Sequence, residues 1–552
     1  MSIASSGFEA VLRRRERDVP AEAAAEWRSK EPWLLGLATF ALSVIFGAIL
    51  VFYYHVMQND AFSRVMDAYY VIFHGFHLAA MGFVWNPLPS LMELPLVMLS
   101  SLWKPLITDA FAGNIVSALT AGVAAFYFTR ILHQFGVSRA YRSLWLLIYV
   151  LNPMILLYEA NGMSDCMMVA MMLASLEGAL RFAKTLSIRA LISSAVWLAI
   201  TFLTRYEAVP FAFFLGLGIL IGLLRTRTKV SKIAGVIIVL ALPITYAGIL
   251  WMLLNWVIMG NPFYFADSSY SNAAQMATGV YTTPITVMAH RHLFTALKVV
   301  TYFGELFPPV LPALALTVIL AVRRKFDIQA LVLIGATVAV PLLQLELLYK
   351  GSSAAWDRYF ITYIPMGFVL IAYLYSLLPQ AMKSWAGALA VLIFLVGDFQ
   401  TWQALQTQGL GHGNRVLVQA LQSGRLLSGT QTAQSRLVTL STMAIAHHEA
   451  NYINTHPKMI VLLDTFQNYG VVPWIQNHNQ LVITNDTNFQ SVLNNPRGRV
   501  TAILDPPSSG LGNLTAINVR YPTMYAGKVP WTRLIKTFQN GDHLYRVLGN
   551  AP

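Results

Sequence analysis

The stretch WLLGLATFALSVIFGAILVFYY (33–54) contains no charged side chain and is long enough to cross a bilayer as one helix. It follows a basic segment, RRRERD (13–18), and a polar one, AEAAAEWRSKEP (21–32). A cleavable signal peptide would instead place a shorter apolar core soon after the basic residues. We therefore interpret the stretch as a first membrane span, preceded by a cytoplasmic N-terminal segment at 1–32.

Similar apolar runs recur as far as residue 400. Hydrophobic residues make up 56% of the chain and charged residues 11%, whereas soluble domains carry about 25% charged residues. A surface so poor in charge suits lipid better than water. The pattern predicts about eleven spans, near residues 33–54, 109–129, 143–157, 166–180, 188–203, 208–224, 233–256, 294–322, 328–348, 359–378 and 385–400.

The stretch 84–100 is also apolar, but it contains Pro87, Pro89 and Pro95. Proline lacks the amide donor that a helix in lipid needs. We expect a re-entrant or interfacial segment here, inside a loop that covers residues 55–108.

The charges of the connecting loops alternate in sign. One set of loops holds Arg13, Arg14, Arg15, Arg139, Arg142, Lys184, Arg189, Arg225, Arg227, Lys229, Lys232, Arg323, Arg324 and Lys325, and the other holds Asp60, Asp165, Glu207, Asp267 and Asp357. The positive-inside rule places the basic set in the cytoplasm. An odd number of spans then places the C-terminal part on the opposite face. We predict a multi-pass plasma-membrane protein with a cytoplasmic N-terminus and an extracytoplasmic C-terminal domain.

The formal net charge is +13. In a soluble protein this would suggest nucleic acid as a partner. Here the Lys and Arg residues lie in short loops between apolar runs, so we interpret them as topology signals and expect membrane lipids, not nucleic acid, as the contact. The single cysteine, Cys166, lies in a predicted span and fits a packing role.

From about residue 401 the composition becomes polar, and short strand-like runs appear at Met459–Leu463, Leu481–Thr484 and Val500–Leu504. A helix-like stretch, Asn485–Asn495, lies between two of them, which is typical of an α/β domain. Neither GxGxxG nor GxxxxGK[ST] occurs there, so no nucleotide site is indicated. The predicted fold is mainly α: a polytopic transmembrane helical bundle over 33–400 and a soluble α/β domain over 401–552.

Acidic residues follow the ends of two predicted spans. Asp60 begins the segment NDAFSRVMDAYYVI, where Arg64 and Asp67 share its helix face at i+4 and i+7. This helix either carries a functional acid or is a solvated interfacial helix with an Asp–Arg pair. Asp165, six residues after Glu159, either takes part in chemistry or caps the next helix.

Arginines accompany these acids. Arg205, Tyr206 and Glu207 stand between two tightly joined spans, where a charged pair is a functional candidate by default. The alternative is a local Arg–Glu pair that tightens the turn. Arg358, in WDRYF, could snorkel to lipid headgroups or bind a lipid phosphate with its guanidinium fork.

These groups suit one mechanism. A lipid-phosphate sugar would place its chain between helices and its sugar in an outer polar cavity. Arginines would neutralise the phosphate leaving group, and a carboxylate would deprotonate the acceptor hydroxyl for in-line attack at the anomeric carbon.

The chain shows a series of short motifs: DAFSR (60–64), WNPLPSLMELP (85–95), NPMILLYEANGMSD (152–165), LTRYEA (203–208), GNPFYFADSSYSNAAQ (260–275) and DRYFITYIP (357–365). Their order over residues 33–378 resembles a bacterial group of the GT-C glycosyltransferase superfamily, close to the dolichyl-phosphate-mannose-protein mannosyltransferase-like, family 39 type. The C-terminal domain is not part of this resemblance.

The resemblance implies an inverting sugar transfer from a polyprenyl-phosphate donor to a lipid, glycan or protein acceptor. It implies Asp60 as the base, Asp165 as the second acid, and Arg358 with Tyr359 as the lipid-phosphate site. It also places Tyr264 and Asp267 in a substrate-facing loop. Relatives often carry two adjacent acids where this chain has Asn59 and Asp60, so no metal ligand is assigned, although a divalent cation stays open as a cofactor.

Two other functions remain open. A transporter or lipid flippase would hold polar residues near the bilayer midplane on broken, repeated helices, whereas the acids here stand at span ends. A non-catalytic scaffold that presents its C-terminal domain would not need acids and arginines on one face.

Overall fold

The computed structural model describes residues 30–549 except 324–326, 408, 411–413 and 426–436. It is mainly helical and has 8 helices long and apolar enough to cross a membrane, or up to 10 if each of two bent pairs is one span. The protein is therefore membrane-embedded. The long helices are α2 (Glu31–Ala48, continued by η1, Ile49–Tyr53), α6 (Phe111–Gln134), α9 (Ser164–Thr185), α11 (Ala208–Arg225), α12 (Val230–Met259), α18 (Ile328–Lys350), α19 (Tyr363–Ser376, preceded by η4, Asp357–Phe360) and α20 (Lys383–Gln406, preceded by η5, Gln380–Met382).

All of the apolar runs found in the sequence contain helices, but three are irregular. α7 (Arg139–Leu151) and α8 (Pro153–Glu159) meet at 73°, and α16 with η3 (Leu293–Leu306) meets α17 (Val310–Arg323) at 108°. α10 (Ile188–Thr204) has 17 residues, which gives a length of about 26 Å against a hydrocarbon core of about 30 Å. These three irregular runs account for the difference between about eleven predicted spans and the 8 to 10 of the structure.

Proline and local capping explain the bends. Pro153 starts α8, and the Asn152 side chain accepts hydrogen bonds from the Met154 and Ile155 amides. The second bend coincides with Pro308 and Pro309. Since proline cannot continue the hydrogen-bond ladder, each run breaks at its proline.

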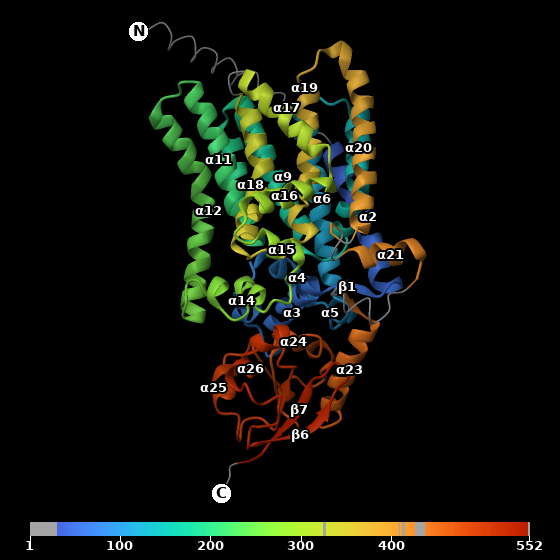
Figure 1. The fold of residues 1–552 in the computed structure, drawn as a ribbon, viewed down its shortest axis with the longest axis vertical. Coiled ribbons are helices and arrows are strands. Elements are labelled where there is room, and N and C mark those ends of the chain that lie inside the picture. The colour runs from blue at the N-terminus through green and yellow to red at the C-terminus, as the bar shows by residue number, and fades with distance from the viewer. Residues whose placement is uncertain (1–29, 324–326, 408, 411–413, 426–436, 550–552) are drawn as a thin grey trace.

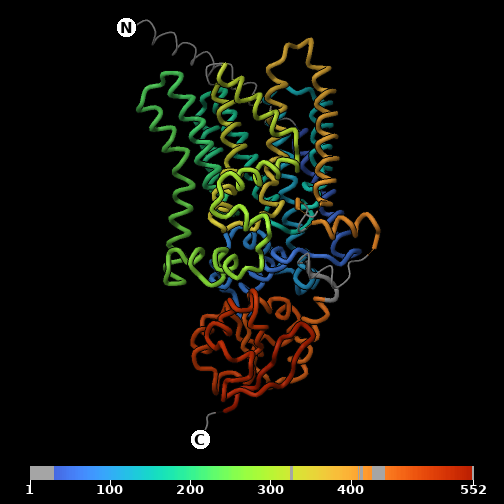
Figure 2. The backbone as a smooth tube through the Cα atoms, in the orientation of Figure 1, coloured from blue at the N-terminus to red at the C-terminus, as the bar shows by residue number. Residues whose placement is uncertain are grey.

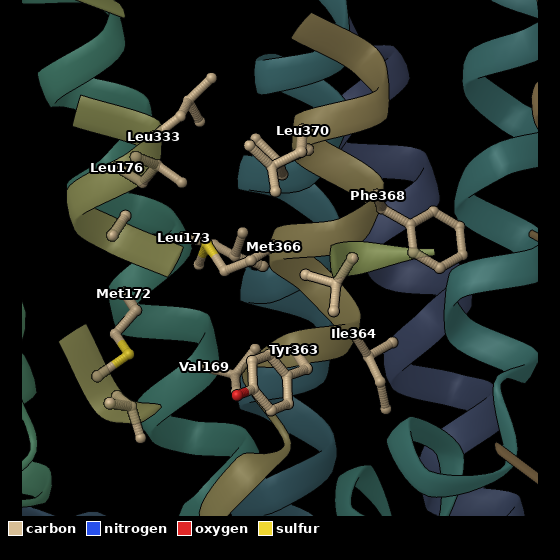
Figure 3. Close-up of a cluster of buried hydrophobic side chains, with 14 of the residues drawn as sticks. Val169, Met172, Leu173, Leu176, Leu333, Tyr363, Ile364, Met366, Phe368 and Leu370 are labelled. Atoms are coloured by element: carbon tan, nitrogen blue, oxygen red, sulfur yellow. The ribbon is translucent and has the colours of Figure 1, made fainter. Parts of the chain in front are cut away.

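Glycines let pairs of long helices pack closely. A Cβ on Gly36 of α2 would lie 2.8 Å from the carbonyl oxygen of Gly122 of α6, and a Cβ on Gly335 of α18 would lie 2.3 Å from that of Phe214 of α11. Small residues at such contacts are the usual means of helix association in lipid. Elsewhere large side chains fill the centre of the bundle, where α9, α18 and α19 meet (Figure 3). Val169, Leu173, Leu333, Met366 and Leu370 belong to this buried cluster.

Short helices gather at one end of the bundle, between it and the C-terminal domain (Figures 1 and 2). They are α3 (Asn59–Phe73), η2 (Leu78–Met81), α4 (Leu88–Val97), α5 (Pro105–Thr108), α13 (Tyr264–Asp267), α14 (Asn272–Ala277) and α15 (Pro284–Ala289). The proline-rich stretch 84–100 forms α4, a ten-residue helix with Pro95 inside it, in agreement with the prediction that it does not cross the membrane as a regular span.

The C-terminal part contains a five-stranded sheet in the order β4-β3-β5-β7-β6. β3 is parallel to β4 and β5, and β7 is antiparallel to β5 and β6. The strands are β3 (Val461–Leu463), β4 (Leu481–Ile483), β5 (Ala502–Asp505), β6 (Thr532–Thr537) and β7 (His543–Val547), with α23 (Leu440–Asn454), α24 (Thr465–Asn468), η6 (Val472–Trp474), η7 (His478–Gln480), α25 (Phe489–Asn494), η8 (Gly510–Leu514) and α26 (Ala516–Arg520) around them. The three strand-like runs of the sequence form β3, β4 and β5. The hairpin of β6 and β7 was not predicted.

Two further elements connect this domain to the bundle. α21 (Arg415–Ser423) follows α20, and β2 (Leu437–Thr439) pairs antiparallel with β1 (Val56–Gln58), just before α3. The chain that leads into the C-terminal domain is thus paired with β1, the segment that directly precedes α3 and Asp60.

The bundle has two chemically different ends. The junction of α11 with α12, the end of α17 and the junction of α19 with α20 lie at the end away from the C-terminal domain (Figure 1). Arg142 binds Glu31, the first residue of α2, at 2.6 Å. The positive-inside rule predicts that the end with the basic loops is cytoplasmic.

Cysteine labelling tests this orientation. Thr226 in the α11–α12 loop and Asn488 in the C-terminal domain are both exposed, and Cys166, the sole cysteine, is buried. In intact cells a membrane-impermeant maleimide should label an Asn488→Cys variant and not a Thr226→Cys variant, while both should react after permeabilisation. Labelling of Thr226→Cys in intact cells would reverse the orientation.

Candidate functional site

An ion pair joins the start of α3 to the turn before α19. The Arg358 guanidinium lies 2.8 Å from the Asp60 carboxylate. Asp60 stands in the first turn of α3, where an acid also stabilises the helix dipole. Its side chain is 33% exposed and that of Arg358 is 13% exposed. The carboxylate is therefore paired and still reachable from outside.

The surroundings of Asp60 keep it ionised. Burial by itself would raise the pKa of this carboxyl, but Arg358, Arg64 and Arg205 outweigh that effect and hold the pKa below its usual value. The sequence suggested an Asp–Arg pair within α3. The structure instead pairs Asp60 with an arginine from a distant part of the chain.

A second group of charges surrounds Arg205, which follows the last residue of α10. Its guanidinium lies 3.0 Å from Asp165 and 2.6 Å from Glu207. It also donates to the Ser164 hydroxyl at 3.3 Å. Asp165 does not cap α9, because the N-cap residue is Met163, which makes no side-chain cap bond. The local Arg–Glu pair exists, but Arg205 additionally ties this turn to the start of α9.

The third arginine, Arg64, is buried on α3 and lies 4.2 Å from the ring centroid of Trp85. Within the part of the chain that the structure describes, its Nε and Nη1 have no hydrogen-bond partner. Two buried acids lie near it. Burial raises the pKa of Asp67 to about 8 despite the opposing effect of Arg64, and burial raises the pKa of Glu93 well above its usual value. Asp67 is therefore mainly neutral at pH 7, and the pKa of Glu93 is shifted in the same direction.

Asp357 completes the network beside Arg358. Its carboxylate accepts hydrogen bonds from the Asn414 side chain at 2.8 Å and from the Arg358 amide at 2.7 Å. Asn414 also donates to the Tyr158 hydroxyl. Four carboxylates, those of Asp60, Asp165, Glu207 and Asp357, thus lie beside Arg205 and Arg358. An anion that binds to either of these two arginines displaces a carboxylate from it.

Aromatic rings line the arginine side of this network. The Arg358 guanidinium lies 4.2 Å from the ring centroid of Trp356 and 5.6 Å from that of Tyr359. Stacking on rings holds a guanidinium in place while its N–H groups remain free to bind.

Other residues singled out in the sequence lie apart from the ion pairs. Glu159 is buried and accepts a 3.4 Å hydrogen bond from Ser43 of α2. The Tyr206 hydroxyl donates to the Val84 carbonyl and accepts from Trp251. Tyr264 packs in the same apolar cluster as Tyr206, and Asp267 is exposed. The structure therefore brings together Asp60, Arg64, Asp165, Arg205, Glu207, Arg358 and Tyr359, and leaves these four residues at the margin.

Sequence reasoning missed several members of the site, namely Glu93, Trp85, Trp356 and Asn414. A signal existed for Glu93, because it is the lone acid in an apolar, proline-rich segment, and a charge in such a place is a functional candidate. Trp85 and Asn414 owe their role to contacts between segments far apart in the sequence, which no local pattern records, whereas Trp356 stands two residues before Arg358 and could have been noted beside it.

The C-terminal domain covers this end of the bundle. Tyr469 donates a hydrogen bond to Asn59, next to Asp60. Tyr270, in the loop between α13 and α14, donates to Asp464 at 2.8 Å, and Asn485 donates to the Ala80 carbonyl at 2.6 Å. Side chains from α3 and from β3 share one apolar core. The domain is thus part of the wall around Asp60.

The arrangement favours anion binding by arginine over metal binding. Among the residues that the structure describes, no group of three or more His, Cys, Asp or Glu side chains is placed to hold a metal ion. A comparison with models of known protein families gives no match, and neither does a search of curated protein sequences. The assignment of a function therefore depends on the geometry and on the motifs of the chain itself.

The contact between the two domains should depend on pH. His74 at the end of α3 lies 2.7 Å from Asp486, whose hydrogen bond raises the pKa of His74. Because the folded pKa is raised, the stabilisation is fully present below the unfolded value, about 6.5, and is lost as the pH rises through the folded pKa. Asp486→Asn should therefore speed amide exchange in residues 478–486 at pH 6 and much less at pH 8.

Hydrogen–deuterium exchange of the purified protein would measure this, with both proteins compared at the same pH. That comparison cancels the opposite contribution of His478, whose pKa is lowered by burial. Equal exchange of the two proteins at pH 6 would show that the ion pair does not hold the domains together.

Proposed function

We propose that this protein is a membrane glycosyltransferase of the GT-C type. It moves a sugar from a polyprenyl-phosphate donor to an acceptor hydroxyl of a lipid, glycan or protein on the extracytoplasmic face, with inversion at the anomeric carbon. The observation that carries the proposal is the pair of Asp60 and Arg358: a reachable carboxylate held by an arginine at the end of an apolar bundle. The order of the motifs that contain both residues supports it.

The donor phosphate competes with Asp60 for Arg358. The phosphodiester of the donor accepts two parallel hydrogen bonds from a guanidinium, as a carboxylate does, and the polyprenyl phosphate that leaves carries more charge than either, so Arg358 binds it more strongly as the bond breaks. The lipid chain can lie among the exposed apolar side chains of the bundle while the phosphate reaches Arg358 at its end. Trp356 keeps the guanidinium in place during this exchange.

The exchange also prepares the base. While Asp60 is paired, its pKa is low and it is a weak proton acceptor. When the phosphate binds Arg358 in place of Asp60, Asp60 loses the positive charge that lowered its pKa most. The effect of burial then prevails, and the pKa of Asp60 rises toward the range in which it accepts a proton.

In the transfer step the acceptor oxygen bonds to the anomeric carbon, its proton passes to Asp60, and the bond from that carbon to the phosphate oxygen breaks. The polyprenyl phosphate leaves with the electron pair and is stabilised by Arg358. Arg205 holds Asp165 and Glu207 beside this centre, where their carboxylates can accept hydrogen bonds from sugar hydroxyls.

A transporter or flippase is the second candidate, because one ion pair lies inside the bundle. Arg130 of α6 and Glu177 of α9 are 2.8 Å apart and each is 1% exposed. Intramembrane charges of this kind often mark transport paths. Glu177 lies about 18 Å along α9 from Asp165, at 1.5 Å per residue, so this pair and the Asp60 site are separate.

Removing the base tests the enzyme proposal. Asp60→Asn should leave the protein folded and membrane-inserted, and should lower sugar transfer from a polyprenyl-phosphate sugar by about 100-fold or more, as loss of general base catalysis does. Thermal unfolding of the purified protein checks the fold, and release of polyprenyl phosphate checks the reaction. Glu346→Gln, an exposed carboxylate at the end of α18, is the matched control with unchanged transfer. Full activity of Asp60→Asn would refute the assignment.

Removing the phosphate partner should instead affect the donor. Arg358→Ala should weaken the binding of a fluorescent polyprenyl phosphate by about 10-fold or more, since hydrogen bonds to charged groups contribute about 1.5–3 kcal/mol. Arg189→Ala removes an exposed arginine elsewhere in the chain and should bind as the wild type does. Donor affinity that is unchanged in Arg358→Ala, with the unfolding temperature preserved, would contradict this role.

A further inference from the structure

In the C-terminal domain most acidic side chains are buried, whereas the basic side chains are exposed or half-exposed. Its carboxylates are Glu449, Asp464, Asp486, Asp505 and Asp542, and its cations are Lys458, Arg497, Arg499, Arg520, Lys528, Arg533, Lys536 and Arg546, counted over residues 440–549. Four of the acids are buried, and the fifth, Asp486, pairs with His74 of the membrane domain. The cations are all exposed or half-exposed. The outer surface of this domain therefore carries positive charge without exposed carboxylates to balance it.

An open hollow of about 720 Å³ gathers some of these cations. Lys458, Arg499 and Arg546 line it together with His456, and no acidic side chain and no Phe, Tyr or Trp does. Arg499 is held by one neutral hydrogen bond, from its Nη1 to the Ser491 hydroxyl at 3.0 Å. The guanidinium and ammonium groups thus keep donors for an external anion.

The hollow faces away from the membrane domain. Most of its residues directly precede β3 and β5, so they lie at the amino ends of these parallel strands, and Ile535 of β6 and the last residues of β7 complete it. The carboxyl ends of these strands carry Asp464 and Asn485, which contact the membrane domain. In Figure 1 β6 and β7 lie on the side of the domain away from the helices of the bundle.

Strand pairing adds a second observation. Arg533 of β6 and Arg546 of β7 are direct partners in the antiparallel register. Like charges directly opposite each other destabilise a sheet. Such a pair is expected where an anion bound from outside supplies the missing negative charge.

We propose that this hollow binds an anionic polysaccharide, a chain of sugars that carries carboxylate or phosphate groups. Arginine forks bind both groups, and the exposed Arg533 opposite Arg546 extends the contact along a polymer. A lipid surface does not fit, because the hollow lies on the side away from the helices. Single-stranded nucleic acid fits less well, because the hollow has no Phe, Tyr or Trp on which a base could stack, and the ring of His456 already packs against Tyr452. The inference does not depend on the proposed transferase activity.

Binding to the full-length protein in nanodiscs tests the proposal. The probes are polygalacturonate for carboxylate, a phosphomannan for phosphate, neutral dextran, and a single-stranded oligonucleotide. We expect at least one of the two anionic polysaccharides to bind with an affinity that falls as salt increases, because exposed charges are screened, and neutral dextran not to bind. Arg499→Gln/Arg546→Gln should weaken that binding at least 10-fold, and Lys458→Gln/Arg499→Gln, which leaves the sheet untouched, should weaken it similarly.

The matched control is Arg520→Gln/Lys528→Gln, which removes the same charge from exposed positions outside the hollow. It should retain affinity within about twofold if the site is the hollow and not the net charge. Equal losses in the control and the hollow variants, or binding of dextran equal to that of the acidic polymers, would overturn the proposal. Tighter binding of the oligonucleotide than of either polysaccharide would replace the polysaccharide by nucleic acid as the partner class.

Discussion

The constraint on which this structure depends is that charges removed from water must neutralise one another. An unpaired ion in such a place costs several kcal/mol even after relaxation. Arg358 therefore lies against Asp60, and Arg205 lies between Asp165 and Glu207. Asp67 and Glu93 lack an ion-pair partner, and burial raises the pKa of both carboxyl groups instead. The pairs Asp60–Arg358 and Asp165–Arg205 each join two separate segments of the chain, so these charges also fix the geometry of the site.

α3 connects the two parts of the molecule. Ten of its 15 residues are buried, and its apolar side chains share a core with the C-terminal domain. The strand before it pairs with β2, and His74 at its end pairs with Asp486. Asp60 is thus positioned by the docking of a domain that lies far away in the sequence. A change at the interface between the two domains should shift the carboxylate of Asp60, because the interface contacts and Asp60 lie on the same short helix.

The pair of Asp60 and Arg358 is well suited to exchange, because the Asp60 side chain is 33% exposed and an incoming anion can reach its place. A phosphate that replaces Asp60 on Arg358 gains two charge-assisted hydrogen bonds, and the displaced carboxylate becomes more basic in the same step. Binding of the leaving group and activation of the base would then be one event. The basic hollow of the C-terminal domain shows the opposite arrangement, because its cations have no acidic neighbours and face solvent.

Much of the membrane part could be predicted from sequence because the bilayer sets the length of each apolar run, and every predicted run contains a helix. The position of Asp60, Asp165 and Arg205 at the ends of runs was equally visible, as were β3, β4 and β5. The prolines at 153 and 308–309 could have predicted the bends, since a missing amide acts locally.

The sequence by itself therefore determined which residues are apolar, helical or charged, and in what order. Only the tertiary structure decided that the partner of Asp60 is Arg358 and not Arg64, that Trp356 and Trp85 lie against the arginines, and that the C-terminal domain shares a core with α3. Helical spacing constrains neighbours three or four residues apart. The pairing of buried charges is chosen among all segments that fold to the same place, and that choice depends on packing in three dimensions.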